Sequence, residues 1–105
     1  MTFNELVEAV RKLPCQEMRA QTENSSEVVV KKAHLSDLNA ALETYFGPPL
    51  KAENQLPTRE AELYTKAYGG IRREQTLYHS KTENAMALLW PWNGGNSVTV
   101  KIVRL

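Results

Sequence analysis

Apolar residues recur at helical spacing near the start of the chain, between Phe3 and Leu13. Intervals of three and four residues place such side chains on one face of a helix. Thr2 precedes the run and Glu5 lies three positions after it, which is the spacing of a capping box. Pro14 cannot continue a helix. The pattern therefore predicts a helix from Phe3 to Lys12.

Two further helices are indicated downstream. Ser36 is a suitable N-cap for an apolar stripe that ends at Gly47-Pro48-Pro49, which predicts a helix from Asp37 to Phe46. Thr58 is a candidate cap for a third helix, and Gly69-Gly70 permits the turn that follows it. The segment between these two helices is rich in proline and polar residues, which is typical of a surface connection.

Strand patterns flank the second helix. Residues 15 to 22 alternate loosely, residues 23 to 26 are polar, and Val28 to Val30 form a β-branched run, which predicts an N-terminal hairpin. Three more strand-like segments close the chain: Ile71 to His79, Ala85 to Trp92 and Ser97 to Arg104. Short turns between them predict an antiparallel meander. The sequence leaves open whether the N-terminal hairpin joins the meander or stands apart.

Even-length loops fix the register of this meander, since a slip of one residue would reverse every side chain. The predicted opposite pairs on one face are His79 and Met86, Leu77 and Leu88, Gln75 and Trp90, Arg73 and Trp92, and then Trp92 and Ser97, Trp90 and Thr99, Leu88 and Lys101, Met86 and Val103. The other face is smaller, smoother and more uniformly apolar, and it collects Tyr78, Thr76, Ala85, Ala87, Leu89, Val98, Val100 and Ile102.

We expect the smooth apolar face to pack against the helices and the tryptophan face to be partly exposed. A mixed aromatic and polar surface is typical of recognition sites. Arg73 would lie over Trp92 in a cation–π pair. The competing interpretation is that the two tryptophans belong to a second core layer, as the continuous apolar run before Trp92 suggests. The candidate binding residues are Arg73, Gln75, Trp90, Trp92, Thr99 and Lys101.

These elements predict a single α+β domain spanning residues 1 to 105, with an antiparallel sheet that ends in the three-stranded meander and two to three helices packed on one face. The formal charge of +1 gives no field that favours duplex nucleic acid or an anionic membrane. The chain has no apolar run long enough to span a bilayer, no secretory signal, and a single cysteine that cannot form an internal disulfide. The expected location is the cytoplasm.

Catalytic chemistry is weakly represented. His34 and His79 are far apart in the sequence and neither has a second ligand at metal spacing. Cys15 lacks the strained turn and oxyanion loop of a nucleophile, and a lone cysteine is usually a small buried hydrophobe. We expect no catalytic residue, no metal and no cofactor.

A cluster of tyrosines offers an alternative site. Tyr64, Tyr68 and Tyr78 would line a small pocket between the third helix and the sheet, with Arg72 near its mouth as an anion-binding group. An ordinary helix and sheet interface, with hydroxyls reaching the surface, explains the same residues.

Three classes of function remain. The first is a non-enzymatic interaction or regulatory module that binds another protein through the tryptophan face or through Ser97 to Arg104 as an unpaired edge strand. The second is single-stranded nucleic-acid binding, with bases stacked on the tryptophans and phosphates on the basic residues, which the near-neutral charge disfavours. The third is a small-molecule binder or minor enzyme that uses the tyrosine pocket.

Overall fold

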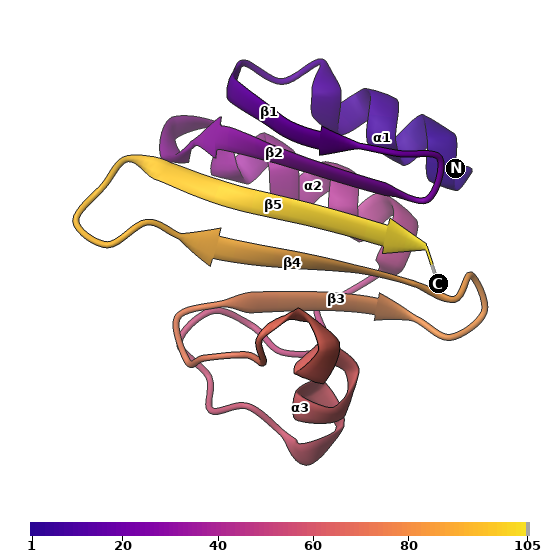
Figure 1. Cartoon of the computed structure of the whole chain (residues 1–105), viewed down its shortest axis with the longest axis vertical. Coiled ribbons are helices and arrows are strands. Elements are labelled where there is room, and N and C mark those ends of the chain that lie inside the picture. The colour runs from indigo at the N-terminus through magenta and orange to yellow at the C-terminus, as the bar shows by residue number, and fades with distance from the viewer. Residues whose placement is uncertain (105) are drawn as a thin grey trace.

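Five strands form one antiparallel sheet in the order β1-β2-β5-β4-β3 (Figure 1). The computed structural model describes residues 1–104, with the side chains of residues 15 and 16 outside the description. The chain is an α+β domain, as predicted, and the N-terminal hairpin joins the meander because β2 pairs with β5. The strands are β1 (Cys15–Gln21), β2 (Ser25–Lys31), β3 (Thr76–Ser80), β4 (Ala85–Pro91) and β5 (Ser97–Arg104).

The predicted register of the meander is confirmed where the strands are paired. Leu77 lies opposite Leu88, and Trp90 lies opposite Thr99. Strand β3 begins only at Thr76, so Arg73 and Gln75 do not continue the ladder. They belong to a turn instead, in which the Gln75 side-chain oxygen accepts a hydrogen bond from the backbone N–H of Arg72 at 2.7 Å.

Helices α1 (Phe3–Arg11) and α2 (Leu35–Phe46) both cover one face of the sheet (Figure 1). The predicted capping box of Thr2 and Glu5 is present at the start of α1. Ser36 is not the N-cap of α2, because the 3₁₀ turn η1 (Lys32–His34) runs directly into the helix and starts it before Ser36. The core under these helices includes Leu6, Val10, Leu38, Leu42, Val28, Val30, Leu89, Val100 and Ile102.

Helix α3 (Arg59–Thr65) packs on the opposite face, over β3 and β4. Thr58 caps it as predicted, because its side chain accepts a hydrogen bond from the backbone N–H of Ala61. Leu77 and Leu88 alternate along their strands with the residues that face α1 and α2, so they point towards α3. Two helices thus share the predicted face, and the third builds a second core layer from Ala61, Leu77, Met86 and Leu88.

The edges of the sheet differ from the prediction. β5 lies between β2 and β4, so Ser97–Arg104 is not an edge strand. The edges are β1 and β3, and β3 is partly covered because Lys51 forms a bridge to Leu77. β1 has register shifts typical of β-bulges, which disfavour the addition of another strand.

Lys51 holds the turn that leads into β3. Its side chain is only 1% exposed, and its Nζ donates hydrogen bonds to the backbone carbonyls of Arg72, at 2.8 Å, and of Arg73 and Gln75. Burial lowers the pKa of Lys51, and the nearby carboxylate of Glu74 opposes this effect. Three carbonyls therefore depend on one buried ammonium group.

We expect Lys51→Met to lower the free energy of unfolding by about 3 kcal/mol, because it leaves these carbonyls without their donor. Lys81→Met, in the exposed turn after β3, is the matched control and should change stability by less than about 0.5 kcal/mol. Urea unfolding of both variants measures the difference. Equal stabilities would show that the Lys51 hydrogen bonds do not hold the turn.

Candidate functional site

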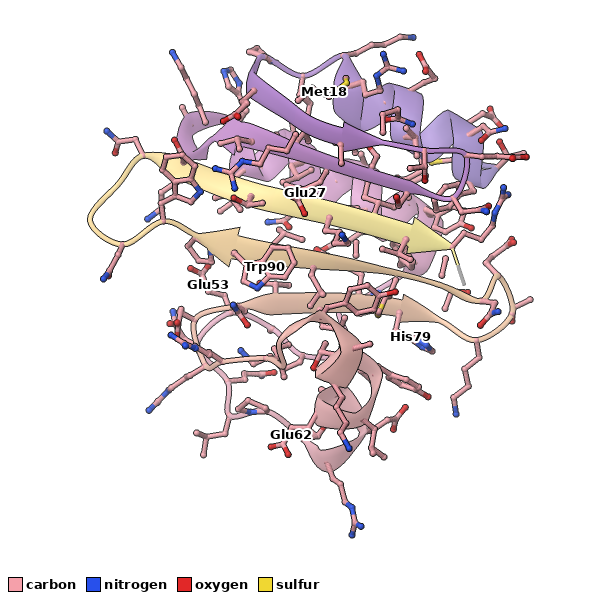
Figure 2. The ribbon with its side chains drawn as sticks, in the orientation of Figure 1. Met18, Glu27, Glu53, Glu62, His79 and Trp90 are labelled. Atoms are coloured by element: carbon pink, nitrogen blue, oxygen red, sulfur yellow. The ribbon has the colours of Figure 1, made fainter. Side chains whose placement is uncertain are left out.

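The face of the sheet that carries α3 is only half covered. The second core layer lies over β3 and β4, whereas within residues 1–104 no α-helix covers β1, β2 and β5 on this side (Figure 1). Figure 2 shows Glu27 on the open half and Trp90 near the boundary. The tryptophan face is thus core over β3 and β4, and over β2 and β5 it has exposed or half-exposed long side chains beside buried ones such as Val29 and Thr99.

The two tryptophans differ in how far they are buried. Trp90 is half-buried and packs against the second core layer. Trp92 is 40% exposed, and its Nε1 donates a hydrogen bond to Oγ1 of Thr99 at 2.8 Å. The indole of Trp92 is therefore held in place by Thr99 while much of its surface stays accessible.

The cation beside Trp92 is Arg19, whose guanidinium carbon lies 5.6 Å from the ring centroid. Arg73 was predicted in this role, but its Nε donates to the backbone carbonyl of Asn54 at 3.3 Å. The prediction failed because β3 begins after Arg73. The sequence did not reveal Arg19 as the partner of Trp92. Arg19 lies on β1, and β1 joins the same sheet as the meander only because β2 pairs with β5.

Trp90 and Trp92 line a surface groove of about 610 Å³ between the turn before β3 and the loop after β4. We call it the tryptophan groove. Gln75, one of the candidate binding residues, lines it, and Figure 2 shows Glu53 close to the Trp90 end. Arg73, Thr99 and Lys101 lie outside it, whereas Arg72 belongs to it. Its lining residues are Glu53, Arg72, Glu74, Gln75, Trp90, Pro91, Trp92, Asn93 and Gly94.

Thr99 and Lys101 support the face rather than line the groove. Thr99 is 7% exposed beneath the Trp92 indole. Nζ of Lys101 lies 3.6 Å from the Glu27 carboxylate and 5.6 Å from the centroid of the Tyr68 ring. The Lys101 charge is already compensated, which lowers its attraction for a phosphate.

The structure does not bring the predicted tyrosine pocket together. Tyr64 belongs to α3 and Tyr68 to the 3₁₀ turn after it, η2 (Lys66–Tyr68). Tyr78 points to the other face of the sheet and donates a hydrogen bond to Oδ1 of Asn39 at 3.0 Å. Successive strand residues point to opposite faces, so Tyr78 is separated from the others by the sheet itself. Tyr64 stacks on His79 instead, with ring centroids 3.9 Å apart.

Two of these groups have shifted pKa values. Burial lowers the pKa of His79, and the neighbouring carboxylate of Glu60 opposes this. Burial, aided by the carboxylate of Glu43, raises the pKa of Tyr78 to about 12. His79 stacks on the Tyr64 ring, and Tyr78 donates a hydrogen bond to the Asn39 amide oxygen. Each side chain thus has a partner within the fold.

Comparison of the chain with family models, with curated proteins and with solved structures gave no match. Within residues 1–104, no helix is long and apolar enough to cross a membrane. The described side chains contain no group of three histidine, cysteine, aspartate or glutamate residues arranged to hold a metal ion. The expectation for the side chain of Cys15 falls outside the described part of the chain.

The raised pKa of Tyr78 predicts a loss of stability at alkaline pH. The folded state binds the phenol proton more tightly than the unfolded state, so the stabilisation is complete below the unfolded pKa of about 10 and falls as the pH approaches about 12. We expect a loss of about 2 kcal/mol over this range, measured by urea unfolding at several pH values. The stability of Tyr78→Phe should depend less on pH than that of the wild type. If the stabilities of both proteins fall equally between about pH 10 and 12, the loss does not come from the Tyr78 phenol.

The two tryptophans should differ in stability when truncated. We expect Trp90→Ala to lower the free energy of unfolding by about 3 kcal/mol, because it opens a cavity in the second core layer. Trp92→Ala should cost about 1 kcal/mol, since it removes one hydrogen bond and a partly exposed ring. Denaturant unfolding compares the variants, and a larger loss for Trp92→Ala would place that residue in the core.

Proposed function

We propose that this chain is a protein-interaction module that binds a basic side chain of its partner in the tryptophan groove. The observation that supports this proposal is the exposed indole of Trp92 in one groove with the carboxylates of Glu53 and Glu74. The single cysteine fits a cytoplasmic setting, which we include in the proposal.

The chemistry of the groove suits a lysine or arginine. A cation over an indole ring gains about 0.5–1 kcal/mol when exposed and about 2 kcal/mol when desolvated. Glu53 and Glu74 supply carboxylates for the same cation, and Gln75 adds an amide to the lining. Arg72 in the groove and Arg19, whose guanidinium carbon lies 5.6 Å from the centroid of the Trp92 ring, both repel an added cation. This repulsion favours a position beside Glu53 and Glu74, on the part of the ring that Arg19 leaves open.

A protein partner fits this face better than single-stranded nucleic acid. The guanidinium of Arg19 lies 3.6 Å from the Glu17 carboxylate, and Lys101 is paired with Glu27 at the same distance. Cations that are paired with carboxylates release few counterions on binding phosphate, and Glu53 and Glu74 would repel a phosphate backbone. Indole rings also serve as anchors of protein interfaces.

Tryptophan fluorescence tests the proposal with two peptides of equal length that differ only in a central arginine or glutamate. We expect the arginine peptide to change the emission and to bind more tightly. Trp92→Ala should weaken its binding by about 2 kcal/mol, or roughly thirtyfold, and Glu74→Gln by about 1 kcal/mol. Binding to Trp92→Ala is followed by a label on the peptide, and Glu62→Gln, exposed on α3, is the matched carboxylate control.

Capture of partners from a native lysate, with one half treated with nuclease, provides an independent check. Proteins that bind the wild type in both halves, and bind Trp92→Ala less, would agree with the proposal. Equal binding of the two peptides would contradict the proposal. Partners that vanish with nuclease and bind more weakly as salt rises would also contradict it and would favour nucleic acid.

A further inference from the structure

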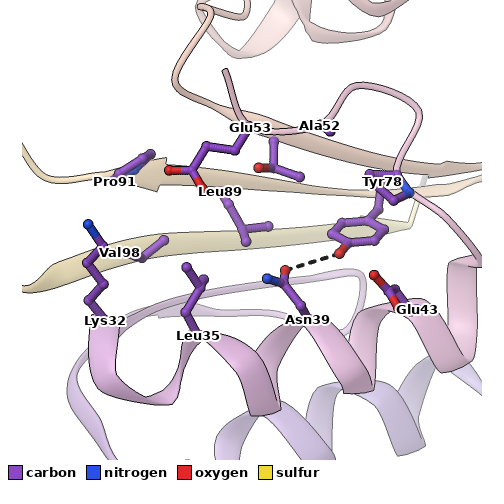
Figure 3. A pocket seen from close by; sticks show the side chains of 12 residues that line it. Lys32, Leu35, Asn39, Glu43, Ala52, Glu53, Tyr78, Leu89, Pro91 and Val98 are labelled. Atoms are coloured by element: carbon purple, nitrogen blue, oxygen red, sulfur yellow. Dashed lines mark hydrogen bonds between the residues drawn. The ribbon is translucent and has the colours of Figure 1, made fainter. Parts of the chain in front are cut away.

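A second cavity lies on the side of the sheet that carries the helices, between the start of α2 and the strands β3, β4 and β5 (Figure 3). Its volume is about 160 Å³. Leu35 of α2 and the buried side chains of Leu89 and Val98 supply apolar walls. This cavity is enclosed enough to hold a small molecule but too small for a peptide.

Charged groups of both signs line this cavity without pairing to each other. Lys32, Glu43 and Glu53 all contribute to its lining. Among the side chains that the structure describes, none of these three forms an ion pair. All three residues are exposed, so their charges are solvated, and opposite charges around one opening offer contacts to a ligand that carries both charges.

Asn39 adds a directed donor. Its Oδ1 accepts the hydrogen bond from the Tyr78 hydroxyl, which fixes the orientation of the amide. Figure 3 shows the amide nitrogen on the side away from Tyr78, towards Leu35. The cavity thus offers a carboxylate two kinds of donor, the ammonium of Lys32 and the amide of Asn39.

The size of the cavity limits the ligand. A cavity of about 150 Å³ in a protein core accepts a molecule as large as benzene, so the present one has room for roughly six to eight non-hydrogen atoms. A simple anion would be repelled by Glu43 and Glu53, and a simple cation would gain nothing from Lys32 and the Asn39 amide. A short apolar chain with one ammonium and one carboxylate satisfies all of these groups.

We propose that the cavity binds a small zwitterionic amino acid. Its carboxylate contacts Lys32 and the Asn39 amide, its ammonium contacts Glu43 or Glu53, and its carbon chain lies against the apolar walls. Glu53 and Pro91 also line the tryptophan groove, but Lys32 and Glu43 line the cavity alone, so variants at these two positions test this site independently of the proposed protein interaction.

The test is a titration followed in NMR spectra by the backbone amide signals of Asn39 and Val98 and by the side-chain amide signals of Asn39. Two probes are zwitterions: L-valine, in which the two charges are close together, and its isomer 5-aminopentanoate, in which they are at opposite ends of the chain. Pentylamine and pentanoate, which carry one charge each, are the other two probes. We expect one or both zwitterions to shift the signals at the cavity and the singly charged compounds to bind at least about tenfold more weakly.

Lys32→Met and Glu43→Gln should each weaken binding of the zwitterion about tenfold, while Lys81→Met and Glu23→Gln, which remove the same charges from exposed turns, should leave it unchanged. Unchanged binding to Lys32→Met, or equal binding of pentanoate and the zwitterions, would overturn the proposal. The absence of any shift with all four compounds would also overturn it. Retention of arginine-peptide binding by Lys32→Met would show that the tryptophan groove is intact.

Discussion

Strand β2 pairs along its length with β5, and the other features of the fold depend on this contact between distant parts of the chain. Seven residue pairs, from Ser25 with Val103 to Lys31 with Ser97, join the N-terminal hairpin to the meander. The pairing makes β5 an interior strand and widens the sheet to five strands. It also gives α1 and α2 a continuous apolar surface on which to pack, which neither a hairpin nor a three-stranded meander offers alone.

The unequal cover of the two faces creates the candidate sites. α1 and α2 seal one face except at the start of α2, where the small cavity remains. α3 covers only β3 and β4 on the other face, so Trp90 is packed and Trp92 is accessible. The turn held by Lys51 forms one wall of the tryptophan groove. The buried ammonium group of Lys51 therefore supports the shape of this exposed surface.

The two proposed sites meet at the end of β4. Pro91 and Glu53 line both the tryptophan groove and the cavity on the helical side. A ligand that engages Glu53 from one side alters the charge that is available on the other, since a carboxylate paired with one cation attracts a second cation less strongly. Glu53 and Pro91 therefore connect the groove for which we propose a protein partner with the cavity for which we propose a small polar ligand.

The amino-acid sequence determines the local features of this protein. The capping box of Thr2 and Glu5, the cap at Thr58 and the alternation in the meander depend on neighbouring residues and short turns, so they can be inferred without knowledge of distant contacts. The register that placed Trp90 opposite Thr99 follows from loop length in the same way. Gln75, Trp90 and Trp92, three of the candidate binding residues, line one groove, although Gln75 reaches it from a turn and not from the predicted strand.

The remaining features depend on contacts between segments that are far apart in the sequence. The start of β3 depends on Lys51, the position of Arg19 beside Trp92 depends on the strand order, and the separation of Tyr78 from Tyr64 depends on the face to which α3 packs. Local propensity carries no information about which strand becomes a neighbour or which face a helix covers. Burial of apolar surface over the whole sheet decides both, because only the assembled fold satisfies every strand and helix together.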